Sequence, residues 1–158
     1  MPITHEGGCQ CGAVRFSISG EYRTTYACHC TICQHQSGSA FGMAVIVGDP
    51  VVRWTRETPS VYVREGLKGT GRSQRCAFCA KCGTRLTHQF FTDQGDMPFV
   101  SIKPGTLDDT STVVPVFHLW TQHKQPWIRF SEGDEVWPQA MPRERMLSYM
   151  LRGRPDDA

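Results

Sequence analysis

Apolar and polar residues alternate over short stretches in the first two thirds of the chain. Residues 12–19 alternate most regularly and then reach Gly20, the pattern of a strand with one buried face. Turn residues such as Gly48-Asp49-Pro50 separate further stretches of this kind. These stretches predict additional strands at 41–47, 51–55, 61–64, 84–91 and 99–102. Short strands at this spacing, without long helices between them, predict a mainly β architecture.

Two short helices are expected beside these strands. Residues 31–36 fit a short helical turn, and residues 142–151 begin with proline, carry an apolar face and are followed by glycine. The tail at 154–158 is expected to fray. Because neither a repeat nor a long linker divides the chain, we expect one main domain at 1–140 and a C-terminal helix and tail at 141–158.

Composition and charge narrow the possible functions. The chain has 158 residues, of which 39% are hydrophobic, and this is enough to form its own core. A net charge of +2, from 17 basic and 15 acidic residues without a basic cluster, predicts neither nucleic acid nor a membrane surface as a partner. No apolar run reaches the roughly 18 residues of a membrane span. The N-terminal residues lack the pattern of a secretion signal, so we expect a cytoplasmic protein.

The eight cysteines fall into three groups along the sequence. In a reducing cytosol, closely spaced cysteines indicate metal binding or catalysis more often than disulfides. A tetrahedral zinc ion with Zn–S distances of about 2.3 Å keeps its sulfur atoms about 3.8 Å apart. Cys79 and Cys82, followed by Gly83, have the spacing of a tight turn that meets this requirement, and glycines around Cys9 and Cys11 permit a similar bend.

The spacing predicts two zinc sites of different kinds. A structural zinc ion has four protein ligands, whereas a catalytic zinc ion has three and keeps its fourth position open. The first and last groups supply the closed site, with Cys9, Cys11, Cys79 and Cys82 as ligands. The middle group supplies the open, catalytic site, with Cys28, Cys30 and Cys33 as ligands.

Other interpretations of the same cysteines stay open. They include a disulfide framework, a redox-active Cys-x-x-Cys pair, and two structural zinc ions. In the last case, Cys76 or a histidine would complete the second ligand set. Cys76 would otherwise be a buried free thiol, which is the commoner fate of a single cysteine.

Several motifs occur together and in a fixed order. They are Gly8-Cys9-Gln10-Cys11-Gly12-Ala13-Val14-Arg15, Cys28-His29-Cys30-x-x-Cys33 followed by Ser37-Gly38, Phe78-Cys79-x-x-Cys82-Gly83-Thr84-x-Leu86, Gly105-Thr106-Leu107-Asp108-Asp109, His118-Leu119-Trp120-Thr121 and Gln125-Pro126-Trp127. Through these motifs, residues 5–130 resemble the family of glutathione-dependent formaldehyde-activating enzymes, also called the centromere protein V-type family. Cys76 departs from the family pattern, which usually has a basic residue before Phe-Cys, and the helix after residue 140 lies outside the resemblance.

The resemblance implies a β-tent fold of twisted antiparallel sheets with zinc knuckles. It also implies two zinc ions per chain, a four-cysteine structural one and a three-cysteine catalytic one. The activity that it implies is the condensation of formaldehyde with glutathione to S-(hydroxymethyl)glutathione, classed as a carbon–sulfur lyase. The alternative function is that of a non-catalytic binding module in which both zinc ions are structural.

The residues themselves suggest how such a reaction would proceed. A thiol at the open zinc position would lose its proton and attack an aldehyde carbon, and a hydrogen-bond donor would stabilise the developing oxyanion. The candidate donors are His29, His35, His118 and the backbone N–H groups near Ser37-Gly38. We expect three arginines, Arg15, Arg75 and Arg85, to offset thiolate charge or face solvent. We expect three aromatic residues, Phe117, Trp120 and Trp127, to lie in the core.

Overall fold

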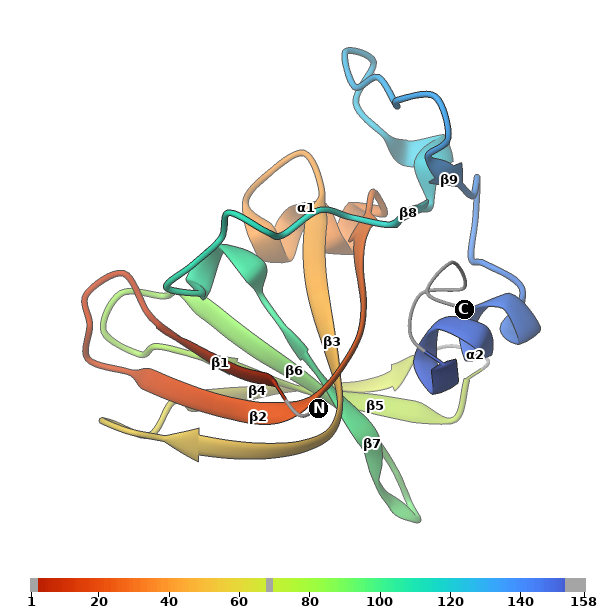
Figure 1. The fold of residues 1–158 in the computed structure, drawn as a ribbon. Helices are drawn as coiled ribbons and strands as arrows, with labels where there is room; N and C mark the ends of the chain where they lie inside the picture. The colour runs from red at the N-terminus through yellow and green to blue at the C-terminus, as the bar shows by residue number, and fades with distance from the viewer. Residues whose placement is uncertain (1–2, 68–69, 153–158) are drawn as a thin grey trace. The chain divides into compact units, whose positions relative to one another are not determined.

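The computed structural model describes residues 3–67 and 70–152, and this part of the chain is mainly β structure (Figure 1). The strands are β1 (Ile3–Gly8), β2 (Arg15–Cys28), β3 (Gly42–Trp54), β4 (Ser60–Leu67), β5 (Arg72–Phe78), β6 (Arg85–Thr92), β7 (Gly95–Ile102), β8 (Phe117–Leu119) and β9 (Glu135–Val136). The helices are α1 (Thr31–Ser37) and α2 (Arg143–Arg152), with the short 3₁₀ turns η1 (Pro104–Thr106) and η2 (Thr121–His123). The expected mainly β class with a short C-terminal helix is confirmed.

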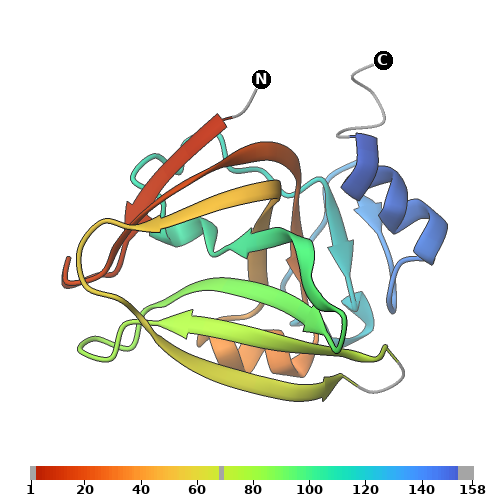
Figure 2. The ribbon, with the colours of Figure 1, turned by 90° about the horizontal axis from the view of Figure 1, so that it is seen from below.

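The strands hydrogen-bond to one another in the order β4-β5-β6-β7-β3-β2-β8-β9, and β1 pairs with β2. The pairs β4–β5, β5–β6 and β6–β7 are antiparallel, as is β1–β2. Figure 2 shows β4, β5 and β6 side by side. The pairs β2–β8 and β8–β9 are parallel, so the sheet is mixed.

The chain divides into two compact units. Unit 1 comprises Met1–Tyr22 and Ile46–Thr112, and unit 2 comprises Arg23–Val45 and Val113–Ala158. Unit 1 therefore holds β1 and β4 to β7, unit 2 holds α1, β8, β9 and α2, and β2 and β3 contribute residues to both. The expected boundary after residue 140 stays a prediction.

The core of unit 1 consists of apolar side chains from several strands. Phe16 and Ile18 of β2 alternate with partly exposed residues, and Val47, Leu86 and Ile102 are completely buried on β3, β6 and β7. This is the alternation that the sequence predicts for a strand with one buried face. None of the helices formed by residues 3–67 and 70–152 combines the length and the apolar character needed to cross a membrane.

The expected breaks in two strands were wrong. β2 continues through Gly20, and β3 continues through Gly48-Asp49-Pro50. A Cβ atom at Gly20 would lie 2.5 Å from the Gly48 carbonyl oxygen and 2.6 Å from Cγ1 of Val47. Gly20 therefore permits a close backbone approach inside the sheet instead of ending a strand. The sequence pattern also gave no indication of β1, β5, β8 and β9.

The core of unit 2 is aromatic. Phe117 stacks on Tyr26 with ring centroids 5.4 Å apart and contacts Tyr149 of α2 at 4.7 Å. Trp120 packs against the same cluster, which confirms the expected places of Phe117 and Trp120. The expectation for Trp127 was wrong, because 68% of this residue is exposed.

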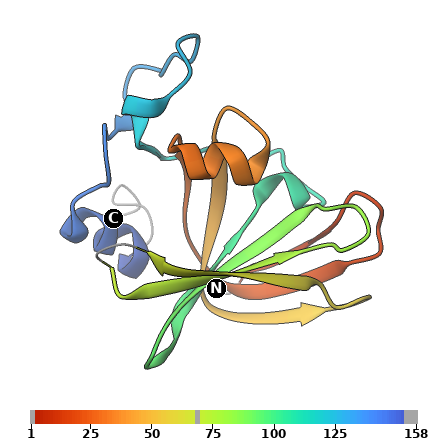
Figure 3. The same cartoon turned by 180° about the vertical axis from the view of Figure 1, so that it is seen from behind.

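Both predicted helices are confirmed. The segment expected at 31–36 forms α1, and the segment expected at 142–151 forms α2, each within one residue of the expected limits. Figure 3 shows α2 following β9 along the chain in unit 2. The tail at 154–158, which we expected to fray, lies outside the described residues.

Candidate metal centres

Four cysteine sulfur atoms come together in unit 1. The Sγ atoms of Cys9, Cys11, Cys79 and Cys82 all lie within 4.8 Å of one another. The Sγ–Sγ distance is 3.5 Å between Cys9 and Cys11 and 3.8 Å between Cys11 and Cys79. A tetrahedral zinc ion holds its sulfur ligands about 3.8 Å apart, so this four-sulfur cluster fits zinc in both geometry and donor chemistry.

Two tight turns bring these sulfurs together. In the second turn, the Gly83 N–H donates to the Cys79 carbonyl oxygen at 2.8 Å, and Gly83 has a φ of +75°, a conformation that favours glycine. In the first turn, the Gly12 N–H donates to the Cys9 carbonyl oxygen at 3.0 Å. The bend expected between Cys9 and Cys11 is therefore present.

Hydrogen bonds favour the thiolate form of two of these four cysteines, Cys9 and Cys82. The Val14 N–H donates to Sγ of Cys9 at 3.2 Å. The Thr84 hydroxyl lies 3.2 Å from Sγ of Cys82, and this contact is the main reason that the pKa of Cys82 is lowered to about 5. Because the thiolate is the form that binds metal, these contacts favour metal binding.

Three more cysteine sulfurs come together in unit 2. The Sγ atoms of Cys28, Cys30 and Cys33 lie within 4.8 Å of one another. Cys28 ends β2, Cys30 is the N-cap residue of α1, and the Cys33 N–H donates to Sγ of Cys30 at 3.4 Å. Hydrogen bonding among the sulfurs raises the pKa of Cys28 and lowers that of Cys30. Such a three-sulfur cluster also suits a zinc ion.

A fourth ligand is not present in the three-sulfur cluster. Among residues 3–67 and 70–152, no further Cys, His, Asp or Glu belongs to it. Cys76 lies in β5 of unit 1, where its thiol is 3.6 Å from Oε1 of Gln74 and burial raises its pKa. All eight cysteines are free thiols, so the disulfide framework considered above does not form.

Two histidines meet beside the three-sulfur cluster. His29, which lies between two of the cysteines, is completely buried, and its Nε2 lies 3.1 Å from Nδ1 of His118. Nε2 of His118 lies 4.0 Å from a carboxylate oxygen of Asp134. Burial lowers the pKa of His29 to about 4 and also lowers that of His118, so both imidazoles are neutral at pH 7. The sequence indicated both histidines but gave no indication of Asp134.

The other candidate donors are used within α1. Nδ1 of His35 hydrogen-bonds the Thr31 carbonyl oxygen at 2.7 Å. The Ser37 hydroxyl donates to the Cys33 carbonyl oxygen at 2.7 Å, and the Gly38 N–H donates to the His35 carbonyl oxygen at 3.3 Å. These contacts close the C-terminal end of the helix.

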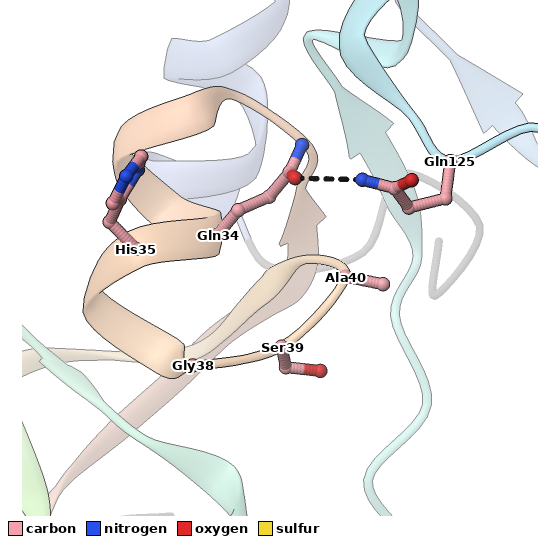
Figure 4. Close-up of a pocket in the computed structure, with 6 residues that line it drawn as sticks. All are labelled: Gln34, His35, Gly38, Ser39, Ala40 and Gln125. Carbon is pink, nitrogen blue, oxygen red and sulfur yellow. Dashed lines mark hydrogen bonds between the residues drawn. The ribbon is translucent and has the colours of Figure 1, made fainter.

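An open hollow of about 450 Å³, lined by both polar and apolar groups, lies beside α1 in unit 2 (Figure 4). The amide Nε2 of Gln34 donates to the carbonyl oxygens of His29 and His123 at 2.8 and 3.0 Å, and its Oε1 accepts from Gln125 at 3.0 Å. In the described part of the chain, the Ser39 hydroxyl and the side-chain oxygen of Gln125 have no protein partner. The hollow therefore presents polar groups that a small molecule can bind.

Two of the three arginines considered above form ion pairs within unit 1. Arg15 donates to both carboxylate oxygens of Asp108, and Arg75 pairs with Asp96. The Arg85 guanidinium instead lies 6.0 Å from the centre of the Tyr62 ring. The sequence did not indicate any of these partners.

A family match and a similar curated protein indicate the same family. The family described as "Glutathione-dependent formaldehyde-activating enzyme" matches residues 4–123, a span that includes both sulfur clusters and excludes α2. A protein of Halomonas elongata named "Putative glutathione-dependent formaldehyde-activating enzyme" is 35% identical over 143 residues, which cover 82% of this chain and 83% of that protein. The crystal structure of a Rhodobacter sphaeroides protein matches 84% of this chain and 98% of its own, with a TM-score of 0.47 and 19% identity.

Proposed function

Because the chain belongs to the family of glutathione-dependent formaldehyde-activating enzymes, we propose that it catalyses the addition of a low-molecular-weight thiol to a small aldehyde. Glutathione and formaldehyde are the proposed substrates, since the name of the Halomonas elongata relative contains both. The thiol sulfur forms a bond to the aldehyde carbon, and the thiol proton moves to the carbonyl oxygen. Nothing is oxidised or reduced, and the reverse reaction is that of a carbon–sulfur lyase.

The observation that carries this proposal is the three-sulfur cluster of Cys28, Cys30 and Cys33, to which the described residues add no fourth ligand. A zinc ion bound there would supply a Lewis-acid position at which a substrate thiol loses its proton. The four-sulfur cluster already has a complete ligand set, so we propose a structural role for it and two zinc ions per chain. Eight free thiols fit a reducing compartment, and we propose a cytoplasmic location.

The hollow beside α1 is the proposed binding site for the part of the thiol molecule away from its sulfur. Cys33 and Gln34 are consecutive residues of α1, so a molecule bound in the hollow lies on the helix that carries a cluster sulfur. The Ser39 hydroxyl can donate a hydrogen bond to a carboxylate of such a molecule, and the Gln125 side-chain oxygen can accept one from an amide N–H. Gln34 fixes the position of α1 through its contacts with His29, His123 and Gln125.

The reaction is tested by nuclear magnetic resonance with ¹³C-formaldehyde and a series of low-molecular-weight thiols that includes glutathione. We expect the zinc-loaded protein to accelerate exchange between free formaldehyde and the hydroxymethyl adduct of at least one thiol. Cys33→Ser should abolish the acceleration and remove one zinc ion per chain. The comparison variant is Cys76→Ser, whose readout is metal content, and it should retain both zinc ions because Cys76 lies in neither cluster.

X-ray absorption spectroscopy separates this proposal from the non-catalytic alternative. With two zinc ions per chain, we expect four sulfur ligands at one ion, and three sulfur ligands plus one light atom at the other. Four sulfurs at both ions, together with no acceleration for any thiol, would establish a binding module with two structural zinc ions.

A further inference from the structure

Three chemically reactive side chains form a buried row across unit 1. Cys76 of β5 lies directly opposite His88 of β6, and His88 lies directly opposite Ser101 of β7, strands that run side by side in Figure 2. Opposed residues of antiparallel strands project from the same face of a sheet, with Cβ atoms about 4.5–5.5 Å apart. Only 1% of Cys76, 3% of His88 and 2% of Ser101 is exposed. This Cys76–His88–Ser101 row has no part in the proposed reaction.

Two polar atoms of the row lack partners. Nε2 of His88 and Oγ of Ser101 are buried and form no hydrogen bond with any of the described residues. Buried polar side-chain atoms are nearly always paired in native proteins, with protein groups, ordered water or a ligand. The row therefore presents two unused hydrogen-bonding groups, on neighbouring strands and on the same face of the sheet.

The surroundings of the row are positively charged. Arg64, Arg85 and Lys103 lie close enough to influence the pKa values of both Cys76 and His88. Burial raises the pKa of Cys76, and burial together with these cations lowers the pKa of His88 to about 2, so both groups are neutral at pH 7. The row itself thus carries no charge that would balance the cations.

The two arginines also lack carboxylate partners. Within the described residues no ion pair involves Arg64 or Arg85, whereas Arg15 and Arg75 of the same unit each pair with an aspartate. The Arg85 guanidinium lies over the Tyr62 ring at 6.0 Å, and this contact does not neutralise its charge. Two guanidinium groups are thus free to bind an anion near the unpaired atoms of the row.

The positive charge around the row distinguishes among a metal ion, a water molecule and an anion as possible ligands. A thiol and an imidazole are metal ligands, but they are only two, and the neighbouring Arg64 and Arg85 guanidinium groups repel a divalent metal ion. A water molecule would satisfy the hydrogen bonds but would leave the guanidinium charges unbalanced. We propose that this face of unit 1 binds a small oxyanion, the carboxylate or phosphate group of a ligand, through the charges of Arg64 and Arg85 and hydrogen bonds from His88 Nε2 and Ser101 Oγ.

The test follows the side-chain signals of His88 by nuclear magnetic resonance in the full-length, zinc-loaded protein. Sodium acetate and sodium phosphate are titrated separately, with sodium chloride keeping the ionic strength constant. We expect a saturable shift of the His88 signals with at least one of the two anions, and the responding anion distinguishes a carboxylate from a phosphate ligand. Arg64→Gln and Arg85→Gln should each raise the dissociation constant at least tenfold. Arg72→Gln, an exposed arginine of β5, should leave it unchanged.

The melting temperature provides a second measurement of anion binding, which can be used for a variant that folds too poorly for nuclear magnetic resonance. The same anion should raise the melting temperature of the wild-type protein and of Arg72→Gln, and should raise that of Arg64→Gln and Arg85→Gln much less. The proposal is overturned if the His88 signals respond to acetate, phosphate and chloride alike, or if all variants respond equally. These outcomes do not depend on whether the protein accelerates thiol addition to formaldehyde.

Discussion

The two sulfur clusters differ most in how far apart their ligands lie along the chain. In the four-sulfur cluster, Cys11 and Cys79 are 68 residues apart, whereas Cys28, Cys30 and Cys33 come from one short segment. A metal ion that joins distant segments removes much more freedom from the unfolded chain than an ion bound by neighbouring residues. The four-sulfur cluster is therefore suited to stabilising unit 1, and the three-sulfur cluster contributes little of this kind.

The surroundings of the clusters differ as well. The three-sulfur cluster packs against the aromatic core of unit 2, in which Phe117 contacts both Tyr26 and Tyr149. Its position is thus fixed by apolar packing even without a metal ion. In the four-sulfur cluster, Cys9 and Cys79 are buried and Cys11 is exposed, and the ligands come from two separate backbone turns instead of one segment. This contrast leads us to expect that metal loss unfolds unit 1 but leaves unit 2 folded.

The largest expected effect is that of Cys82→Ser. This change removes one of four ligands that join the N-terminal segment of unit 1 to the turn between β5 and β6, and we expect a loss of at least about 5 kcal/mol in the free energy of unfolding. Zinc analysis and urea denaturation followed by circular dichroism measure the change. If Cys82→Ser and Cys33→Ser destabilise the protein equally, the division into a structural and a catalytic cluster is wrong.

Cys33→Ser should separate function from stability. We expect the loss of one zinc ion per chain and a change of less than about 1 kcal/mol in the free energy of unfolding, because this ion closes no long loop. The rate of thiol addition should fall by about 100-fold or more, since even outer contacts of a metal site contribute about 10–100-fold. Retention of full activity with one zinc ion would contradict the proposed catalytic role.

Side-chain contacts, and not metal, should hold the C-terminal part of unit 2. Glu135 accepts hydrogen bonds from Arg145 at 2.7 Å, Tyr149 at 2.5 Å and Trp137 at 2.9 Å. The Arg145 contact is the main reason that the pKa of Glu135 is lowered to about 2. Glu135→Gln should therefore cost about 2 kcal/mol at pH 7. Glu144→Gln, at an exposed position of α2, is the matched control and should have almost no effect.

The pH dependence of this contribution has a definite sign. The pKa of Glu135 is lower in the folded protein than the value of about 4.3 expected for an unfolded chain. Its contribution is therefore complete above that pH and is lost as the pH falls from about 4.3 towards 2. Denaturation of the wild-type protein and of Glu135→Gln across this range should show curves that converge at low pH, and parallel curves would disprove the assignment.

The smallest expected effect concerns the hollow. Gln125→Ala removes one hydrogen-bonding group from its lining, so the KM for the thiol should rise about 3- to 10-fold while kcat changes little. Steady-state kinetics with the responding thiol measures both constants. Gln94→Ala, at an exposed turn of unit 1, serves as the control, and an equal rise in KM there would remove the hollow from the binding site.

Spacing within each group predicted that Cys28, Cys30 and Cys33 come together, because neighbouring ligands can reach one metal ion whatever the rest of the chain does. The joining of Cys11 with Cys79, 68 residues away, was predicted instead from the four ligands that a closed site requires. The His118–Asp134 contact and the hollow at Gln125 could not be predicted in this way, since they join residues from distant segments of unit 2. β5 was not expected because its sequence, RSQRCAF, lacks a clear apolar alternation, and its buried Gln74 is an exception to the usual exposure of polar side chains. The strand end predicted at Gly20 was wrong because glycine is favoured both in tight turns and where two strands approach closely.

The separation of Cys11 from Cys79 has a consequence for protein synthesis. At about 5–20 residues per second, the ribosome needs about 3–14 s to extend the chain by the 68 residues from Cys11 to Cys79. During this interval the thiols of Cys9 and Cys11 have been synthesised and those of Cys79 and Cys82 have not. The three ligands of the three-sulfur cluster, in contrast, are synthesised within about a second of one another. The nascent chain thus acquires its middle cluster first, and its N-terminal thiols pass through a period in which oxidants and competing metals can reach them.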